Sequence, residues 1–235
     1  MLIIGFSTGS WANVISWLPG VEQIEIVEIN PDYMKMASDR PEVSAILDNN
    51  KVNYHIDDGR RWLKRNPDQR FDLIVMNSSY HFRNSVTHVL SKEMLELAQS
   101  RLNKRGVFYF NTTGSPDAFR TAAEVFSVTS SYKYFVAASD SPFVLDRATT
   151  LMRLASMKNG SELVFGNSPA ELERFDKMLD IDMVEFPLVA SSLPRKTHTI
   201  TDNTPVTEYQ YGWLAGKLGL IDPEPWQASW PQSGK

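Results

Sequence analysis

Short apolar runs alternate with amphipathic runs through the first half of the chain. The short apolar runs predict strands at residues 2–4, 23–28, 52–56, 71–76 and 107–111. The apolar character of residues 71–76 is nearly continuous, which is typical of a strand in the middle of a parallel sheet. These runs end on or are followed by glycine, acid or asparagine, so polar groups are expected at the strand ends.

The amphipathic runs between these strands carry apolar residues at helical spacing. Serine followed by proline, as in Ser115-Pro116 and Ser168-Pro169, predicts a helix start, and Asn30-Pro31 is a similar signal. The predicted helices span residues 10–18, 31–36, 42–47, 59–65, 91–102, 116–125 and 169–179. A strand–helix alternation of this kind forces parallel pairing, with helices on both faces of the sheet.

The pattern is less regular in the second half of the chain. Residues 132–138 and 150–155 predict two strands at an antiparallel edge, although the second segment would suit a helix equally. From residue 187 on, the chain is polar and rich in proline, and we expect a tail packed over the core. The prediction is one α/β domain over residues 1–235, with a Rossmann-like, doubly wound, mostly parallel sheet of seven strands.

Composition narrows the possible functions of the 235-residue chain. A net charge of −4 and 42% hydrophobic residues fit a globular protein and offer no electrostatic case for nucleic acid or anionic membrane. The absence of cysteine excludes disulfides and thiolate chemistry, and the four histidines lack metal-ligand spacing. With neither a signal peptide nor an apolar run of about 18 residues, we expect a cytoplasmic protein without membrane contact or metal.

The turn after the first strand, Gly5-Phe-Ser-Thr-Gly, has its two glycines in a G-x-x-x-G pattern. Glycine lets backbone N–H groups approach a ligand closely, and the helix that follows adds partial positive charge. The spacing differs from the G-x-G-x-x-G of dinucleotide-binding enzymes, so a dehydrogenase is a weaker alternative. Gly5, Ser7, Thr8 and Gly9 are the candidate ligand contacts in this turn.

Acids mark the ends of the next two strands. Glu28 closes the second strand, and Asp57-Asp58-Gly59 follows the third. Ligands of doubly wound sheets bind outside the carboxyl ends of the strands, where Glu28 would accept ribose hydroxyls and Asp58 an adenine amino group. Each acid also has a simpler explanation, because Glu28 could be a surface carboxylate and Asp58 a helix N-cap. Together with the glycine turn, the two acids favour a nucleoside pocket.

Several segments together resemble the spermidine synthase family, which has the class I fold of S-adenosylmethionine-dependent methyltransferases. The similar segments lie between residue 2 and about residue 209, and they are Leu2-Ile-Ile-Gly, Val27-Glu-Ile-Asn-Pro, Asp58-Gly-Arg, Phe71-Asp-Leu-Ile-Val, Leu102-Asn-Lys-Arg-Gly-Val and Thr201-Asp-Asn-Thr-Pro. The tract Asn77-Ser-Ser-Tyr-His-Phe-Arg is more similar to the synthase-like domains of larger, often membrane-attached bacterial proteins. The family's N-terminal β-hairpin domain has no counterpart before Leu2, so a domain taken from a longer parent is one expectation.

The resemblance implies a cosubstrate and residues that bind it. S-adenosylmethionine or its decarboxylated form would bind, leaving S-adenosylhomocysteine or methylthioadenosine as product. Glu28 would hold the ribose, Asp58 the adenine amino group, and Ile29 would pack on the adenine ring. The glycines of the turn would admit the tail and the sulfonium. The full set of expected contacts is Gly5, Ser7, Thr8, Gly9, Glu28, Ile29, Asp57, Asp58, Gly59 and Asn77.

The acceptor half departs from the family pattern. Asn77 falls where the family places a catalytic aspartate that helps to deprotonate the attacking amine, and an amide cannot take that proton. Tyr80 replaces a second acid, and Thr8 an aspartate that would bind the propylamine ammonium. With His81 as a candidate base, these residues could serve another acceptor. Asp140 and Asp202 could restore acidity, although a role in turns is as good an explanation.

Two functions therefore remain open. The first is a transferase of polyamine biosynthesis or a related methyltransferase that passes an aminopropyl or methyl group to a small-molecule acceptor, an amine being one candidate. The changes at Asn77 and Tyr80 make ordinary putrescine aminopropylation doubtful, and a homodimer is compatible with the resemblance. The second is an inactive nucleoside-binding or scaffolding domain of a larger, membrane-associated protein.

Overall fold

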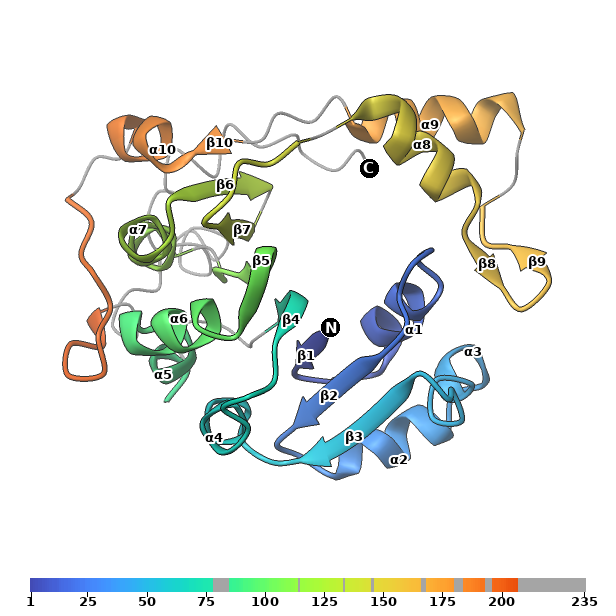
Figure 1. Ribbon diagram of the computed structural model, residues 1–235, viewed down its shortest axis with the longest axis horizontal. Helices are drawn as coiled ribbons and strands as arrows, with labels where there is room; N and C mark the ends of the chain where they lie inside the picture. Colours follow the sequence, from blue (N-terminus) through green and yellow to red (C-terminus); the bar gives the residue numbers. More distant parts are fainter. Residues whose placement is uncertain are drawn as a thin grey trace, which may run out of the picture. The chain divides into compact units, whose positions relative to one another are not determined.

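The computed structural model describes residues 1–77, 85–113, 115–132, 134–144, 146–165, 168–179, 184–192 and 196–206. The chain divides into two compact units (Figure 1). The first comprises Met1–Trp62 and Phe143–Asp182, and the second Leu63–Pro142 and Met183–Lys235. Among the described residues, no helix is long and apolar enough to cross a membrane.

Three parallel strands form the sheet of the first unit. They are β1 (Leu2–Ile4), β2 (Ile24–Glu28) and β3 (Val52–Ile56), paired in that order. Every residue of β1 and β2 is buried, including the acids Glu25 and Glu28 of β2. The helices that accompany this sheet are α1 (Ser10–Ser16), α2 (Asp32–Ser38), α3 (Pro41–Ser44) and the start of α4 (Gly59–Arg65).

The start of α2 agrees with its sequence signal, whereas the buried face of α1 differs from the predicted one. Asn30 accepts a hydrogen bond from Asp32 N through its Oδ1 at 3.1 Å, so the predicted asparagine signal lies where expected, although the helix begins after Pro31. In α1, Ile15 is buried, whereas Trp11 and Val14 are exposed, contrary to the predicted apolar face.

A helical pair completes the first unit. It consists of α8 (Arg147–Ala155), the short strands β8 (Lys158–Asn159) and β9 (Glu162–Leu163), and α9 (Pro169–Leu179). The strand predicted over residues 150–155 is wrong, because α8 covers it. Thr150 Oγ1 donates to the carbonyl oxygen of Asp146 at 2.8 Å, a helical i−4 bond that offsets the β-preference of threonine. The capping box that opens α9 is confirmed by bonds in both directions between Ser168 and Glu171.

The sheet of the second unit has a parallel part and an antiparallel edge. The parallel pair is β4 (Phe71–Met76) and β5 (Leu102–Asn111). The antiparallel strands follow in the order β7 (Phe135–Ser139), β6 (Val128–Tyr132) and β10 (Val184–Glu185). The helices of this unit are α5 (Thr87–Leu90), α6 (Lys92–Gln99), α7 (Pro116–Val125) and α10 (Phe186–Ser192).

Two boundaries in the second unit differ from the prediction. The strand expected at residues 132–138 corresponds to β7, which pairs antiparallel as expected but begins at Phe135, and the preceding strand β6 was not predicted. The polar residues of β6 do not form the apolar pattern that is expected of a buried strand. Ser131 of this strand is nevertheless buried, because its hydroxyl donates to Val184 O at 3.1 Å and therefore needs no hydrogen bond to solvent. The helix expected to reach residue 102 ends at Gln99, and β5 begins at Leu102.

Hydrogen bonds attach residues 198–200 to α6 and α7. Asp117, fully buried, accepts from His198 N at 2.7 Å, and Ile200 N donates to Thr121 Oγ1 at 2.9 Å. Ile200 itself is fully buried, and its carbonyl oxygen accepts from Lys92 N at 2.8 Å. This segment and α10 belong to the part of the predicted tail that the structure describes, residues 187–192 and 196–206.

Candidate functional site

The turn between β1 and α1 closes around the carboxylate of Glu28. Glu28 Oε2 accepts hydrogen bonds from Phe6 N at 2.7 Å and Ser7 N at 3.2 Å, and Oε1 accepts from Asn30 N at 2.8 Å. The side chain is only 5% exposed. Such charge-assisted bonds are strong, so this one carboxylate joins the turn to the end of β2.

The turn reaches the carboxylate through unusual backbone angles. Gly5 and Gly9 have φ of 91° and 81°, and Ser7 between them has φ of 52°. A left-handed conformation is uncommon for serine, and here it accompanies the bond from Ser7 N to Glu28. The predicted residues Gly5, Ser7, Gly9 and Glu28 are thus brought together.

The bonds of Glu28 limit what the residue can offer a ligand. A carboxylate has about four lone-pair positions, and three are directed to backbone N–H groups in this structure. Glu28 is therefore not the plain surface carboxylate of the simpler explanation. Its expected contact with ribose hydroxyls stays a prediction.

The acids after β3 shape the start of α4. Asp58 Oδ1 accepts from Arg61 N at 2.8 Å, which is an N-cap, and Asp57 pairs with the Arg61 guanidinium. The simpler explanation of Asp58 is thus present in the structure, while adenine binding by Asp58 stays a prediction. A Cβ at Gly59 would lie 2.5 Å from Ile4 Cγ2, so close packing on β1 explains that glycine.

Apolar side chains are exposed beside these acids. Ile29, directly after Glu28, is 70% exposed, and Ile56, directly before Asp57, is 51% exposed. Aliphatic groups beside a few polar groups are typical of small-molecule sites. The expected packing of Ile29 on an adenine ring requires this exposure.

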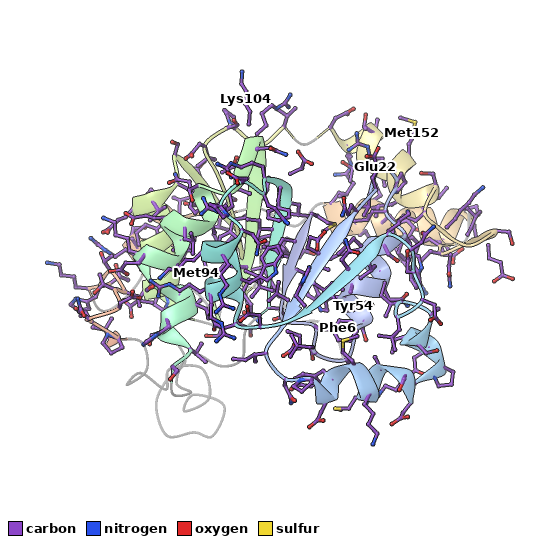
Figure 2. The ribbon with its side chains drawn as sticks, turned by 60° about the horizontal axis from the view of Figure 1, so that its bottom comes forward. Phe6, Glu22, Tyr54, Met94, Lys104 and Met152 are labelled. Atoms are coloured by element: carbon purple, nitrogen blue, oxygen red, sulfur yellow. The ribbon has the colours of Figure 1, made fainter. Side chains whose placement is uncertain are left out.

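Phe6 and Tyr54 support the turn from within the first unit. Their rings meet edge to face at 5.6 Å, and Tyr54 Oη donates to Ile46 O at 2.8 Å (Figure 2). Burial, with a smaller effect of the Asp48 charge, raises the pKa of the Tyr54 phenol far above its ordinary value. Tyr54 is therefore a neutral packing residue.

In the second unit, Asn77 follows β4 and bonds to a residue that the sequence did not single out as a site residue. Asn111 Nδ2 donates to Asn77 Oδ1 at 3.0 Å, and Thr113 N donates to Asn111 Oδ1 at 2.7 Å. Asn77 thus lies in a network of side-chain amides. The predicted Tyr80 and His81, with Arg83, lie outside the described residues.

The two acids proposed to restore acidity both hold local structure. Asp140 accepts from Gln99 Nε2 and from Ser127 N, and Asp202 Oδ1 accepts from Ser91 Oγ at 2.7 Å. Ser91 is itself the N-cap of α6. The structural explanation of both acids is therefore supported by their contacts.

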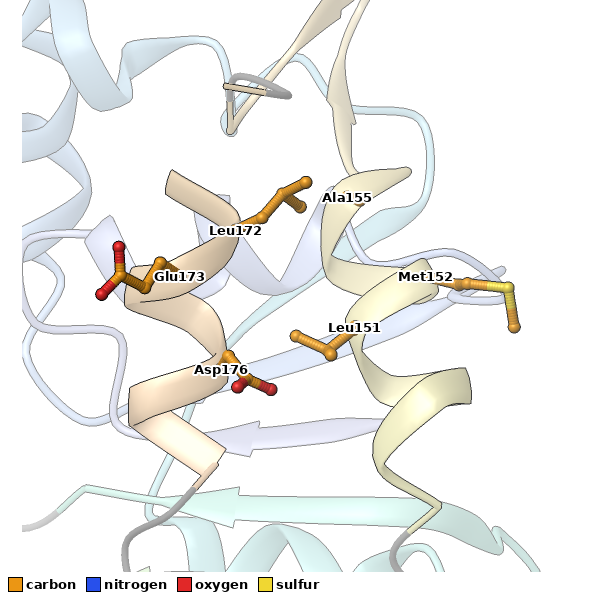
Figure 3. Close-up of a pocket in the computed structure, with 6 residues that line it drawn as sticks. All are labelled: Leu151, Met152, Ala155, Leu172, Glu173 and Asp176. Carbon is orange, nitrogen blue, oxygen red and sulfur yellow. The ribbon is translucent and has the colours of Figure 1, made fainter. Parts of the chain in front are cut away.

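A hollow of about 460 Å³ lies between α8 and α9 (Figure 3). Leu151, Leu172 and other largely apolar side chains line it, and none of the predicted site residues that the structure describes does. In the described part of the chain, no group of three or more histidines and acids could hold a metal ion.

Comparison with known proteins identifies the family of the chain. The family model described as the spermine/spermidine synthase domain matches residues 1–143. The chain belongs to this family. A curated family relative, the polyamine aminopropyltransferase of Streptococcus uberis, is 33% identical over 119 residues, which are 49% of this chain and 40% of that protein. The chain thus spans less than half the length of this relative.

Solved structures show the fold of the family. The spermidine synthase of Thermotoga maritima aligns with a TM-score of 0.52 at 16% identity, covering 94% of this chain and 68% of that one. Human methyltransferase-like protein 13, solved in complex with SAH, aligns with a TM-score of 0.54 at 16% identity, covering 75% and 81%. A structural similarity at such low sequence identity is evidence for the fold alone. They confirm the predicted Rossmann-like, class I methyltransferase fold.

Proposed function

We propose that the first unit binds the nucleoside part of S-adenosylmethionine or of its decarboxylated form. The observation that carries the proposal is the closure of the glycine turn on Glu28, with Ile29 exposed and Asp58 at the next strand end. The family supports it, since its curated relatives include a polyamine aminopropyltransferase. A methyltransferase of the same fold has been solved with SAH.

The residues of the first unit fit this ligand. The free lone-pair position of Glu28 is available to a ribose hydroxyl, and Ile29 offers an apolar surface to the base. Thr8 carries no charge, which suits the carboxylated cosubstrate better than the cationic propylamine of the decarboxylated form. Methyl transfer is therefore the favoured reaction, with aminopropyl transfer as the alternative.

The bound sulfonium would supply an electrophilic carbon: the acceptor's lone pair forms the new bond, the C–S bond breaks, and its electron pair stays on sulfur as the acceptor releases a proton. The protein contributes alignment, which can supply much of the rate of such a displacement. Asn77 cannot take the proton. Losing a well-placed base lowers rates about 10²–10⁴-fold, so ordinary putrescine aminopropylation should be slow.

Calorimetry with S-adenosylmethionine, its decarboxylated form and methylthioadenosine tests the binding step. We expect binding of at least one, and Glu28→Gln should weaken it at least about tenfold, because a hydrogen bond to a charged group contributes roughly 1.5–3 kcal/mol. Glu22→Gln, at an exposed position in the same unit, is the matched control and should change nothing. Binding of none of the three would overturn the proposal.

A second candidate function is a nucleoside-binding domain without catalysis, within a larger membrane-associated protein. The observation that favours it is the amide network at Asn77, which lacks a base. Tight binding of S-adenosylmethionine without transfer to any of a panel of amines, carboxylates and hydroxyl compounds would favour this second function. Restored putrescine turnover in Asn77→Asp would instead indicate a synthase that has lost its base.

A further inference from the structure

The carboxyl ends of β4 and β5 are joined by a short chain of side-chain hydrogen bonds. Met76 pairs with Phe110 in the parallel register, so Asn77 and Asn111 stand one step further along neighbouring strands. Asn111 Nδ2 donates to Asn77 Oδ1 at 3.0 Å, and Thr113 N donates to Asn111 Oδ1 at 2.7 Å. We call Asn77, Asn111 and Thr113 the amide ladder.

The hydrogen bonds of the amide ladder can run in only one donor-to-acceptor direction. The oxygen and nitrogen of an asparagine amide are normally assigned from their partners. A backbone N–H can only donate, so the Thr113 N–H requires the oxygen of Asn111 on its side. The NH₂ of Asn111 must then face Asn77, and it requires the oxygen of Asn77 in turn.

The direction of the ladder leaves a donor at its end. Because the oxygen of Asn77 is turned towards Asn111, its Nδ2 points away from the ladder. Asn77 is half-buried, and among the residues that the structure describes, none accepts a bond from this Nδ2. The edge at which ligands of parallel sheets bind therefore presents an N–H group here, where a carboxylate would present an acceptor.

We propose that Asn77 selects an acceptor molecule that carries an oxygen group, a carboxylate above all, and disfavours an ammonium group. The inference rests on the proposed function and names the substrate class of that transferase. An amide N–H bonds most strongly to a charged oxygen, whereas an ammonium ion would meet another donor. Asn111 acts as a positioning residue, because it sets which atom Asn77 presents.

The direction of the ladder can be tested without any ligand. In NMR spectra of the full chain, the NH₂ group of Asn111 should exchange with solvent more slowly than that of Asn77. In Asn111→Asp, the introduced carboxylate can accept from both Thr113 N and Asn77, so the Asn77 amide should turn round and its NH₂ should become the protected one. Faster exchange at Asn111 than at Asn77 in the wild type, or no change at Asn77 in the variant, would overturn the inference.

Selectivity is tested with two probes of equal chain length, succinate and butane-1,4-diamine, by calorimetry with methylthioadenosine present. The wild type should prefer succinate, and Asn111→Asp should shift the ratio of affinities towards the diamine at least about tenfold, with Asn77 itself unchanged. Asn49→Asp is the matched control, because Asn49 Oδ1 likewise accepts from the backbone N–H two residues on, Lys51 N at 3.0 Å. The control adds the same charge and should leave the ratio unchanged.

The results that would overturn the selectivity differ from those that would overturn the proposed function. A wild type that prefers the diamine or binds neither probe, or an equal shift in Asn49→Asp, would overturn the selectivity. Methylthioadenosine should bind Asn111→Asp as it binds the wild type. If the nucleoside fails to bind the wild type while the ladder has the expected direction, the proposed function fails and the assignment of the Asn77 donor stands.

Discussion

At the scale of single residues, Gly9 shows that the glycine turn has a packing requirement in addition to its predicted role in binding. Its φ of +81° is left-handed, and a Cβ there would lie 2.9 Å from Cζ of the buried Phe6. Phe6 in turn contacts Tyr54 and donates its N–H to Glu28. The G-x-x-x-G pattern is therefore explained partly by the core of the first unit.

Gly9→Ala should destabilise the protein more than Gly20→Ala. Gly20 has a similar φ of +86° with nothing within 4 Å of its hypothetical Cβ, so its substitution adds only the left-handed strain, about 1–2 kcal/mol. At Gly9 the clash with Phe6 should add about 1–3 kcal/mol to the loss. Urea unfolding of the two variants measures the difference. Equal losses would mean that Phe6 moves aside without strain.

At the scale of elements, the start of α4 combines a cap with a predicted ligand contact. Asp58 accepts from Arg61 N, and the following Gly59 packs directly on Ile4. A cap requires only an oxygen at this position, whereas a contact with an adenine amino group gains from the charge of the carboxylate. Two substitutions can therefore separate the roles.

Asp58→Ala should lower the free energy of unfolding by about 1 kcal/mol, whereas Asp58→Asn, which keeps an oxygen acceptor, should change it by only a few tenths. If Asp58 also binds the base, both variants should lose nucleoside affinity. Urea unfolding and calorimetry on the same samples provide the two measurements. Unchanged affinity in both variants would leave Asp58 as a cap alone.

The elements that sequence patterns predicted well are those with local signals. The capping box at Ser168 and the proline after Ser115 mark helix starts that the structure confirms. Strand β6 was not predicted, and for residues 150–155 the sequence left strand and helix equally open. Ser131 bonds to Val184 in a distant strand, and Thr150 bonds back to Asp146.

At the scale of the whole molecule, half-buried tyrosines link stability to alkaline pH. Burial raises the pKa of Tyr109 to about 12, and the neighbouring Tyr132 adds to the shift. Tyr109 stacks on Phe135 at 5.0 Å, within the sheet of the second unit. The unfolded chain releases this proton near pH 10, so above that pH the native state holds more protons than the unfolded state.

Stability should therefore be unaffected by Tyr109 below about pH 10 and should fall as pH rises from there towards 12. Tyr109→Phe should reduce the steepness of this fall, because phenylalanine has no proton to lose. The free energy of unfolding in urea, measured at several alkaline pH values, provides the comparison. A wild type and a variant with parallel pH profiles would contradict the prediction.

The sequence by itself determined the features that depend on neighbouring residues. The glycine turn, the acids Glu28 and Asp58 and the capped helix starts at Ser115 and Ser168 could be located, because capping and turn chemistry act over a few residues. The family resemblance then assigned the fold and the nucleoside pocket, and the comparisons confirm the family and the fold.

Only the tertiary structure decided what those residues contact. That two of the three backbone N–H groups bound by Glu28 come from Phe6 and Ser7 depends on a turn more than 20 residues away. That Asn77 faces Asn111 depends on the register of β4 and β5, which shifts between Phe71 and Leu73. A single-residue slip in register would replace one partner by another without changing any local pattern, so the donor at Asn77 could not be predicted from the sequence alone.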